Sequence, residues 1–146
     1  MIRAADLASH LRGAVAELRH VGTARDFATA RAGSIVHPSA WIIVLGENAQ
    51  PNRYQTSALV DQRVTARFGV ILAARDIGDR TGARAVGDIE EMRTRIIGAM
   101  ASHVPTGCET ACTPVSGRLL SGIGRDGAMF WQDDFQTAFN RRVTSS

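Results

Sequence analysis

A glycine-rich stretch near the C-terminus has the spacing of a cofactor-binding motif. Residues 122–127 read Gly-Ile-Gly-Arg-Asp-Gly and match the G-x-G-x-x-G pattern that binds the pyrophosphate of a dinucleotide. That pattern needs a helix after the third glycine and an acidic residue about twenty positions later. Here the strand-like Met129-Phe130-Trp131 follows, and the chain ends before such an acid. We therefore predict a hairpin turn and no dinucleotide cofactor.

Cysteine and histidine residues offer a second candidate site, for a metal ion or a nucleophile. His103, Cys108 and Cys112 are neighbours in the sequence, but structural zinc takes four ligands and its paired cysteines are usually separated by two residues. A nucleophilic cysteine would need a histidine that the fold positions beside it. We expect loop thiols that can form a disulfide under oxidation, and no bound metal.

Two doublets of acids are the remaining candidates for catalysis. Glu90-Glu91 falls in a helical pattern and Asp133-Asp134 in a strand pattern, so the carboxylates of each doublet point in different directions. Both doublets are predicted to be solvent-exposed charge. The sequence also contains no H-E-x-x-H or G-x-S-x-G motif. We predict that the protein is not an enzyme and needs no cofactor.

All 17 basic residues of this 146-residue chain are arginine. The absence of lysine excludes a phosphate-binding P-loop, a pyridoxal Schiff base and the lysine motifs of kinases. Residues 1–73 hold eight arginines against five acids, whereas residues 74–146 hold nine of each, so the net charge of +3 lies in the first half. These arginines are spread out, while a nucleic-acid patch is usually denser. An Arg-rich nucleic-acid-binding module is kept as an alternative.

Membrane insertion and export are not expected. A membrane-spanning helix needs ~18 consecutive apolar residues, and the longest comparable run is the short segment 41–45. Asp6, His10 and Arg12 interrupt the apolar residues at the N-terminus, which is unlike a signal peptide. Two cysteines suit a reducing compartment. We expect synthesis in the cytoplasm and no membrane partner.

Helical spacing of apolar residues predicts two long helices. The first is expected over about residues 3–20, with Gly22 just beyond its end. Its apolar stripe consists of Leu7, Leu11, Val15 and Leu18. The second is expected to end before Pro105. Its stripe consists of Ile89, Met92, Ile96, Met100 and Val104. A short helix over residues 23–31 is also predicted, because Thr23 and Asp26 resemble a capping box.

Strand patterns occupy the rest of the chain. The apolar run at residues 40–45 predicts a strand that is covered on both faces, and the polar residues 46–57 predict a long loop. Residues 60–72 alternate between apolar and polar side chains, which predicts a long half-buried strand. Its polar face ends in Ile71, so we expect that face to become covered there. A final hairpin is predicted, with strands at residues 115–121 and 129–139.

These elements predict an α+β fold. We expect a single domain over residues 1–146, with a mainly antiparallel sheet of about four strands and two main helices packed on one of its faces. The segments between consecutive strands are rich in turn residues, which favours antiparallel pairing. No repeat or linker divides the chain.

The order of these elements and several local strings resemble the tail terminator, or tail completion, proteins of long-tailed bacteriophages and prophages. The resemblance spans most of the chain, although residues 106–113 do not match the pattern. The strings that carry it are Pro38 with Trp41-Ile42-Ile43-Val44-Leu45-Gly46-Glu47, Pro51-Asn52, Gln62-Arg63-Val64, Phe68-Gly69-Val70, Asp79 with Gly82, Pro105, Gly117-Arg118-Leu119-Leu120 and Trp131-Gln132-Asp133-Asp134-Phe135.

The resemblance implies a structural protein of the virion, made in the cytoplasm of the host bacterium. Such a protein forms a homohexameric ring on the last ring of tail tube protein at the neck. It stops tube growth and provides the surface to which the head, through its connector or completion protein, docks. DNA would only pass non-specifically through the ring. A related neck subunit, such as a head-tail joining protein, is a structural alternative.

A head-to-tail ring needs two different complementary patches on each subunit. We expect the long loop, the turn around Arg125 and the polar face of the long strand to supply them. Arg63 and Arg67 could there make bidentate contacts to acids of a partner, or form exposed salt bridges of little energetic value. The candidate interface residues are Asn48, Asn52, Arg53, Tyr54, Gln55, Arg63, Arg67 and Arg125.

Overall fold

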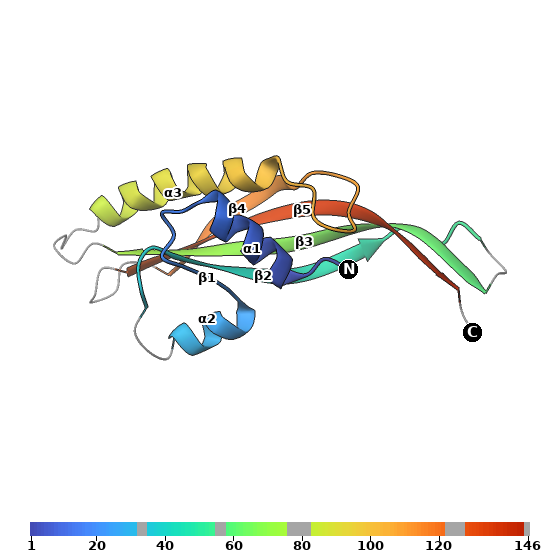
Figure 1. Ribbon diagram of the computed structural model, residues 1–146, viewed down its shortest axis with the longest axis horizontal. Helices are drawn as coiled ribbons and strands as arrows, with labels where there is room; N and C mark the ends of the chain where they lie inside the picture. Colours follow the sequence, from blue (N-terminus) through green and yellow to red (C-terminus); the bar gives the residue numbers. More distant parts are fainter. Residues whose placement is uncertain (32–34, 55–57, 76–82, 122–127, 145–146) are drawn as a thin grey trace.

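The protein has an α+β fold in which helices lie against both faces of a central sheet (Figure 1). The computed structural model describes residues 1–31, 35–54, 58–75, 83–121 and 128–144. Within these residues there are three helices and five strands. In chain order they are α1 (Ala4–Ala14), β1 (His20–Thr23), α2 (Ala24–Arg31), β2 (Ser39–Ala49), β3 (Leu59–Arg75), α3 (Ala83–Ala101), β4 (Thr113–Ser121) and β5 (Ala128–Thr144).

The sheet is mixed and its strand order is β1-β2-β3-β5-β4. Only β1 and β2 run parallel, and the other neighbours are antiparallel. At its centre β3 and β5 pair without a register shift from Leu59↔Thr144 to Arg75↔Ala128. The antiparallel pairing of β4 with β5 confirms the predicted hairpin. Residues 122–127 lie outside the described residues, but a strand follows them and not a helix.

The alternation of residues along β3 creates the main core. Its even-numbered residues from 64 to 74 are buried on the face that α1 and α3 cover, which we call the helical face. Phe68 of β3 stacks there on Phe135 of β5, with 5.5 Å between the ring centroids. The helices bury Leu7 and Leu11 from α1 and Ile96 and Met100 from α3 against this face. The predicted apolar stripes of both long helices are therefore confirmed at these positions.

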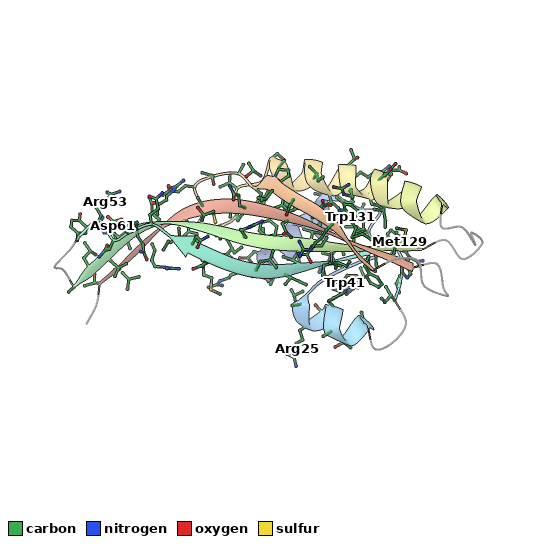
Figure 2. The ribbon with its side chains drawn as sticks, turned by 180° about the vertical axis from the view of Figure 1, so that it is seen from behind. Arg25, Trp41, Arg53, Asp61, Met129 and Trp131 are labelled. Atoms are coloured by element: carbon green, nitrogen blue, oxygen red, sulfur yellow. The ribbon has the colours of Figure 1, made fainter. Side chains whose placement is uncertain are left out.

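The second face of the sheet is covered at one end by α2, which the prediction of helices on one face did not include. Trp41, Ile71 and Ala73 form a separate buried cluster there, with Phe27 of α2 packed against it. The rings of Phe27 and Trp41 lie 5.1 Å apart. The coverage expected near Ile71 is thus confirmed, and the helix that provides it is the short one. Beyond α2 this face, called the open face below, carries no helix in the described residues (Figure 2).

The first helix is shorter than predicted, and it is followed by β1, a strand that the prediction of about four strands did not include. Helix α1 ends at Ala14, and β1 pairs in parallel with residues 39–42 of β2. Val15 and Leu18 are still buried, although they lie in a turn. The apolar spacing misled the prediction because a turn can bury the same residues as another two turns of helix. A four-residue strand is also too short to show an alternating pattern.

The predicted long loop is partly strand. After a register shift between Val44 and Gly46, β2 continues along β3 to Ala49, so Asn48 lies in a strand and pairs with Thr65. Polar residues predominate at residues 46–49 because this part of β2 is exposed on both sides of the sheet. The strand therefore shows no apolar signal here.

The segment after α3 folds into turns that support the edge of the sheet. Gly107, with φ of 82°, allows the turn in which Cys108 N donates to Pro105 O. Cys108 and Cys112 are free thiols in this segment, as predicted, and Cys112 is fully buried in the main core. Burial, with a smaller contribution from Cys108, raises the pKa of the Cys112 thiol to about 11.

His103 begins this segment and stacks on His10 of α1. The ring centroids are 3.6 Å apart with an interplanar angle of 9°, and His10 Nε2 contacts Ala99 O at 2.9 Å. Burial, and then the positive charge that His10 can carry, lower the pKa of His103. The folded protein therefore binds the His103 proton less readily than the unfolded chain does.

We predict that the free energy of unfolding decreases as the pH falls below about 6.5, the ordinary pKa of histidine. His103→Gln should lose part of this pH dependence, because glutamine does not titrate. Urea unfolding at a series of pH values between 8 and 5 measures both slopes. Equal slopes in the two proteins would contradict the role assigned to His103.

Candidate interaction surfaces

Two strands extend beyond the rest of the sheet as a ribbon. Strand β2 pairs with β3 only as far as Ala49↔Val64, whereas β3 and β5 continue to Leu59↔Thr144. Residues 59–63 and 140–144 therefore form a two-stranded projection, which we call the ribbon, at the end of the molecule away from α2 (Figure 1). A projection of this kind can reach a neighbouring molecule without moving the core.

Residues 50–54 are held along the ribbon by hydrogen bonds. Gln50 N donates to Arg63 O at 2.8 Å, and Arg53 N donates to Asp61 O at 2.9 Å. The Asn52 side chain donates to Tyr54 O and Leu59 O, while its oxygen accepts from Asp61 N at 2.7 Å. This part of the predicted loop is consequently an ordered extension of the sheet.

The loop residues that were predicted to form an interface have different environments in the structure. The amide of Asn52 bonds to the backbone of its own chain, so it organises the connection. Arg53 has a side chain that is 71% exposed and 3.9 Å from Asp61, and Tyr54 is 41% exposed. Figure 2 places Arg53 and Asp61 together at the tip of the molecule. Gln55 and Arg125 lie outside the described residues.

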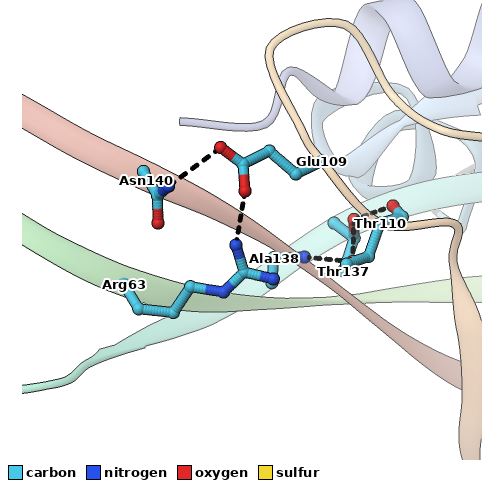
Figure 3. A network of polar contacts seen from close by, with 6 residues as sticks. All are labelled: Arg63, Glu109, Thr110, Thr137, Ala138 and Asn140. Carbon is cyan, nitrogen blue, oxygen red and sulfur yellow. Dashed lines mark hydrogen bonds and ion pairs between the residues drawn. The ribbon is translucent and has the colours of Figure 1, made fainter.

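Arg63 joins the ribbon to the segment that follows α3 (Figure 3). Its Nη1 lies 2.6 Å from Glu109 Oε2, and Asn140 of β5 donates to the other oxygen of Glu109. The backbone of Glu109 also donates to Ala138 O. Neighbouring Thr110 bonds to Thr137 and Ala138, so this segment extends the sheet beyond β4. Arg63 thus has an acidic partner within its own chain.

Arg67 belongs to a charged cluster on the open face. Its Nη2 lies 3.9 Å from Asp134 Oδ2, which Arg118 of β4 approaches at 3.1 Å. Asp134 also accepts hydrogen bonds from Ser116 and Gln132 and is only 4% exposed. A hollow of about 390 Å³ opens beside this cluster. Its lining includes Leu45, Glu47, Asn48, Thr65, Arg67 and Asp134.

Asp133 makes a second cluster, on the helical face. Arg93 of α3 donates from both Nε and Nη2 to this carboxylate, at 2.9 and 2.8 Å, and Trp131 Nε1 donates at 3.1 Å. The Arg93 guanidinium also lies 4.4 Å from the centre of the Trp131 ring. The hydrogen bond to Asp133 raises the pKa of Arg93. This cluster fastens the exposed side of α3 to β5.

The prediction that Asp133 and Asp134 are solvent-exposed was therefore wrong. Both carboxylates are buried, on opposite faces of β5, because each is surrounded by donors from neighbouring elements. Glu90 and Glu91 are exposed, as predicted. Only the opposite directions of the two aspartates followed from the sequence.

Two glycines make room for these carboxylates, a role that the sequence patterns did not indicate. A Cβ atom on Gly117 would lie 2.5 Å from Asp133 Oδ1, and one on Gly69 would lie 2.7 Å from Gln132 Nε2. Each glycine pairs directly across from an aspartate, Gly117 with Asp133 and Gly69 with Asp134. A glycine inside an otherwise β-favouring strand signals such a close approach.

We predict that Gly117→Ala lowers the free energy of unfolding by about 1–3 kcal/mol, because the new methyl group displaces the Asp133 carboxylate or Arg93. Gly98→Ala is the matched control. Nothing lies within 4 Å of the Cβ position of Gly98, which is inside α3, so alanine should stabilise by about 0.5–1 kcal/mol. Chemical denaturation measures both changes. A neutral Gly117→Ala variant would show that the carboxylate is not confined.

Among the described residues, no group of three or more His, Cys, Asp or Glu side chains could hold a metal ion. No helix in the described part of the chain is long and apolar enough to cross a membrane. In the residues that the structure describes, the exposed features include the ribbon, the side chains of Arg67 and Arg118 around Asp134, and the outer edges of the sheet.

Comparison with known protein families shows to which family this chain belongs. The model of the phage tail terminator protein family matches residues 1–145, essentially the whole chain. The chain belongs to the phage tail terminator family. It is therefore a structural component of the bacteriophage tail, and the resemblance drawn from the sequence strings is confirmed. A search of curated proteins finds no match.

Proposed function

We propose that this tail terminator caps the head-proximal end of the tail tube as a homohexameric ring. The ring ends polymerisation of the tube protein and forms the surface to which the head docks, at the neck of the virion. The family match over residues 1–145 is the observation that carries the proposal. No catalytic step is part of this function.

The shape of the subunit supports a capping role. The ribbon projects from one end of the sheet, and residues 50–54, which are hydrogen-bonded along it, present the cationic Arg53 and the aromatic Tyr54. We call Arg53 and Tyr54 the ribbon tip. Arginine and tyrosine are enriched where protein interfaces are buried. We assign this tip to contacts with the tail tube or with the adjacent subunit. A tip that is fixed by Asn52 would bind with a small entropic cost.

The arginines support protein partners over a nucleic-acid-binding module. Within the described residues seven arginines have a carboxylate partner of the same chain: Arg53, Arg63, Arg67, Arg93, Arg95, Arg118 and Arg141. Such pairs reduce the positive potential that would attract phosphates. DNA is accordingly proposed only to pass through the ring, while the tube protein and the head-tail connector or completion protein are the specific partners.

We predict that the double variant Arg53→Ala/Tyr54→Ala folds normally but fails to cap tails, because it removes exposed side chains from the ribbon tip. Tail tubes assembled with it should grow beyond their normal length, and the fraction of tails joined to heads should fall at least about tenfold. Electron microscopy of lysates measures tube length and joining. Arg25→Ala, which removes an exposed arginine from α2, away from the ribbon, is the control and should leave both unchanged.

The mass of the wild-type assembly tests the ring itself. Six subunits of 15.7 kDa give about 94 kDa, which native mass spectrometry resolves from other oligomers. The protein should be measured both alone and after isolation on tail tubes. Normal capping by the Arg53→Ala/Tyr54→Ala variant would contradict the role of the ribbon tip. A monomer in both preparations would contradict the ring.

A further inference from the structure

The sheet has two exposed edges that differ from each other. Strand β4 is the outermost strand at one side, and residues 113–120 are all exposed. At the other side β1 covers only residues 39–42 of β2, so residues 43–49 have a free outer edge in the described structure. Free edges present unpaired backbone N–H and C=O groups, which favour pairing with another strand.

Apolar side chains accompany both edges. Leu119 and Leu120 on β4 are 46% and 40% exposed, and Val44 and Leu45 on β2 are 37% and 44% exposed. Large apolar residues do not prevent a free edge from pairing with another chain. Proteins usually prevent such pairing with charged side chains, with a covering helix or loop, or with very short edge strands. Exposed apolar side chains of this kind are typical of edges that another strand covers.

We propose that β4 of one copy pairs with residues 43–49 of β2 in the next copy, so that the sheets of neighbouring subunits join into one continuous sheet. This inference rests on the ring proposed above and names the contact that closes it. The partner at each edge is a second copy of this chain. The helices then lie outside the strand-to-strand contact, on the faces of the sheet.

The strand directions fit this pairing. Antiparallel pairing links β2 to β3, β3 to β5 and β5 to β4, so β4 runs opposite to β2. Rotation about an axis along the strands leaves every strand direction unchanged from copy to copy. Strand β4 then meets the next β2 in the antiparallel arrangement, which is the slightly more stable one. A head-to-tail contact between two different edges is also the type that builds rings.

The charges on the two edges fit as well. Arg118 is the single charged residue of β4, and Glu47 is the single charged residue of the segment 43–49. Within its own chain Arg118 lies 3.1 Å from Asp134, and Glu47 contacts Arg141. Pairing the two different edges would place Arg118 near Glu47 of the next copy and join these two ion pairs into one network across the contact. A symmetric β4–β4 pairing centred on Arg118 would bring two arginines together, and a symmetric β2–β2 pairing centred on Glu47 would bring two glutamates together, which disfavours these two registers.

Disulfide trapping tests the pairing. Four double variants combine Leu119→Cys or Leu120→Cys with Val44→Cys or Leu45→Cys, in a Cys108→Ser background that keeps the buried Cys112. Within one subunit β2 and β4 are three strand spacings apart, about 14 Å, so these cysteines cannot bond to each other. We expect mild oxidation of at least one double variant to give a ladder of covalent multimers up to the hexamer. Single variants should form no covalent multimers, so they should run as monomers on non-reducing denaturing gels.

A charge substitution provides the second measurement. Leu119→Lys should raise the concentration needed for assembly at least about tenfold, because it places an ammonium group in a strand contact that excludes water. Val104→Lys is the matched control, since Val104 is 48% exposed and belongs to neither β4 nor residues 43–49 of β2. The control should assemble like the wild type, and both variants should keep the thermal stability of the monomer.

The outcomes separate this inference from the proposed function. A 94 kDa wild-type assembly, with no covalent multimers from any of the four double variants after oxidation, would overturn the edge pairing and leave the ring intact. Efficient dimers from Leu119→Cys alone would overturn it in favour of a symmetric β4 contact. A wild-type protein that stays at 15.7 kDa even on tail tubes would overturn the ring and the edge pairing together.

Discussion

The pairing of β3 with β5 is the interaction on which the rest of the structure depends. These two 17-residue strands pair along their whole length, and every other layer is built on them. Their helical face provides Phe68 and Phe135 for the main core, while the opposite face provides Ile71 for the cluster beneath α2. Their excess length over β2 produces the ribbon. One uninterrupted ladder thus sets both the core and the projecting surface.

Strand β5 also places two adjacent carboxylates in different environments. Because successive side chains alternate between faces, Asp133 meets Arg93 and Trp131 beneath α3, whereas Asp134 meets Arg67 and Arg118 on the open face. Asp133 ties a helix to the sheet, and Asp134 ties β4 to β3 through β5. Arginine suits both sites because its planar guanidinium can donate several hydrogen bonds at once.

A chain that belongs to the tail terminator family and leaves two sheet edges free is well suited to head-to-tail assembly. The edges differ in charge, and the helices leave both accessible, so association need not disturb the core. The ribbon lies at the end away from α2, which separates it from the buried cluster around Trp41. The proposed capping contact and the proposed contact between subunits therefore lie on different surfaces of one small subunit.

The sequence by itself determined the elements with strong periodic patterns: the long strand β3, the apolar stripes of α1 and α3, the β4–β5 hairpin, and the family. Local spacing carries this information because each pattern reflects one buried face. Tertiary structure alone decided the additional strand β1, the ordered course of residues 50–54 and the burial of Asp133 and Asp134. Arg93 reaches Asp133 across 40 positions and Arg63 reaches Glu109 across 46. Contacts between such distant residues leave no periodic trace, so only the folded chain defines them.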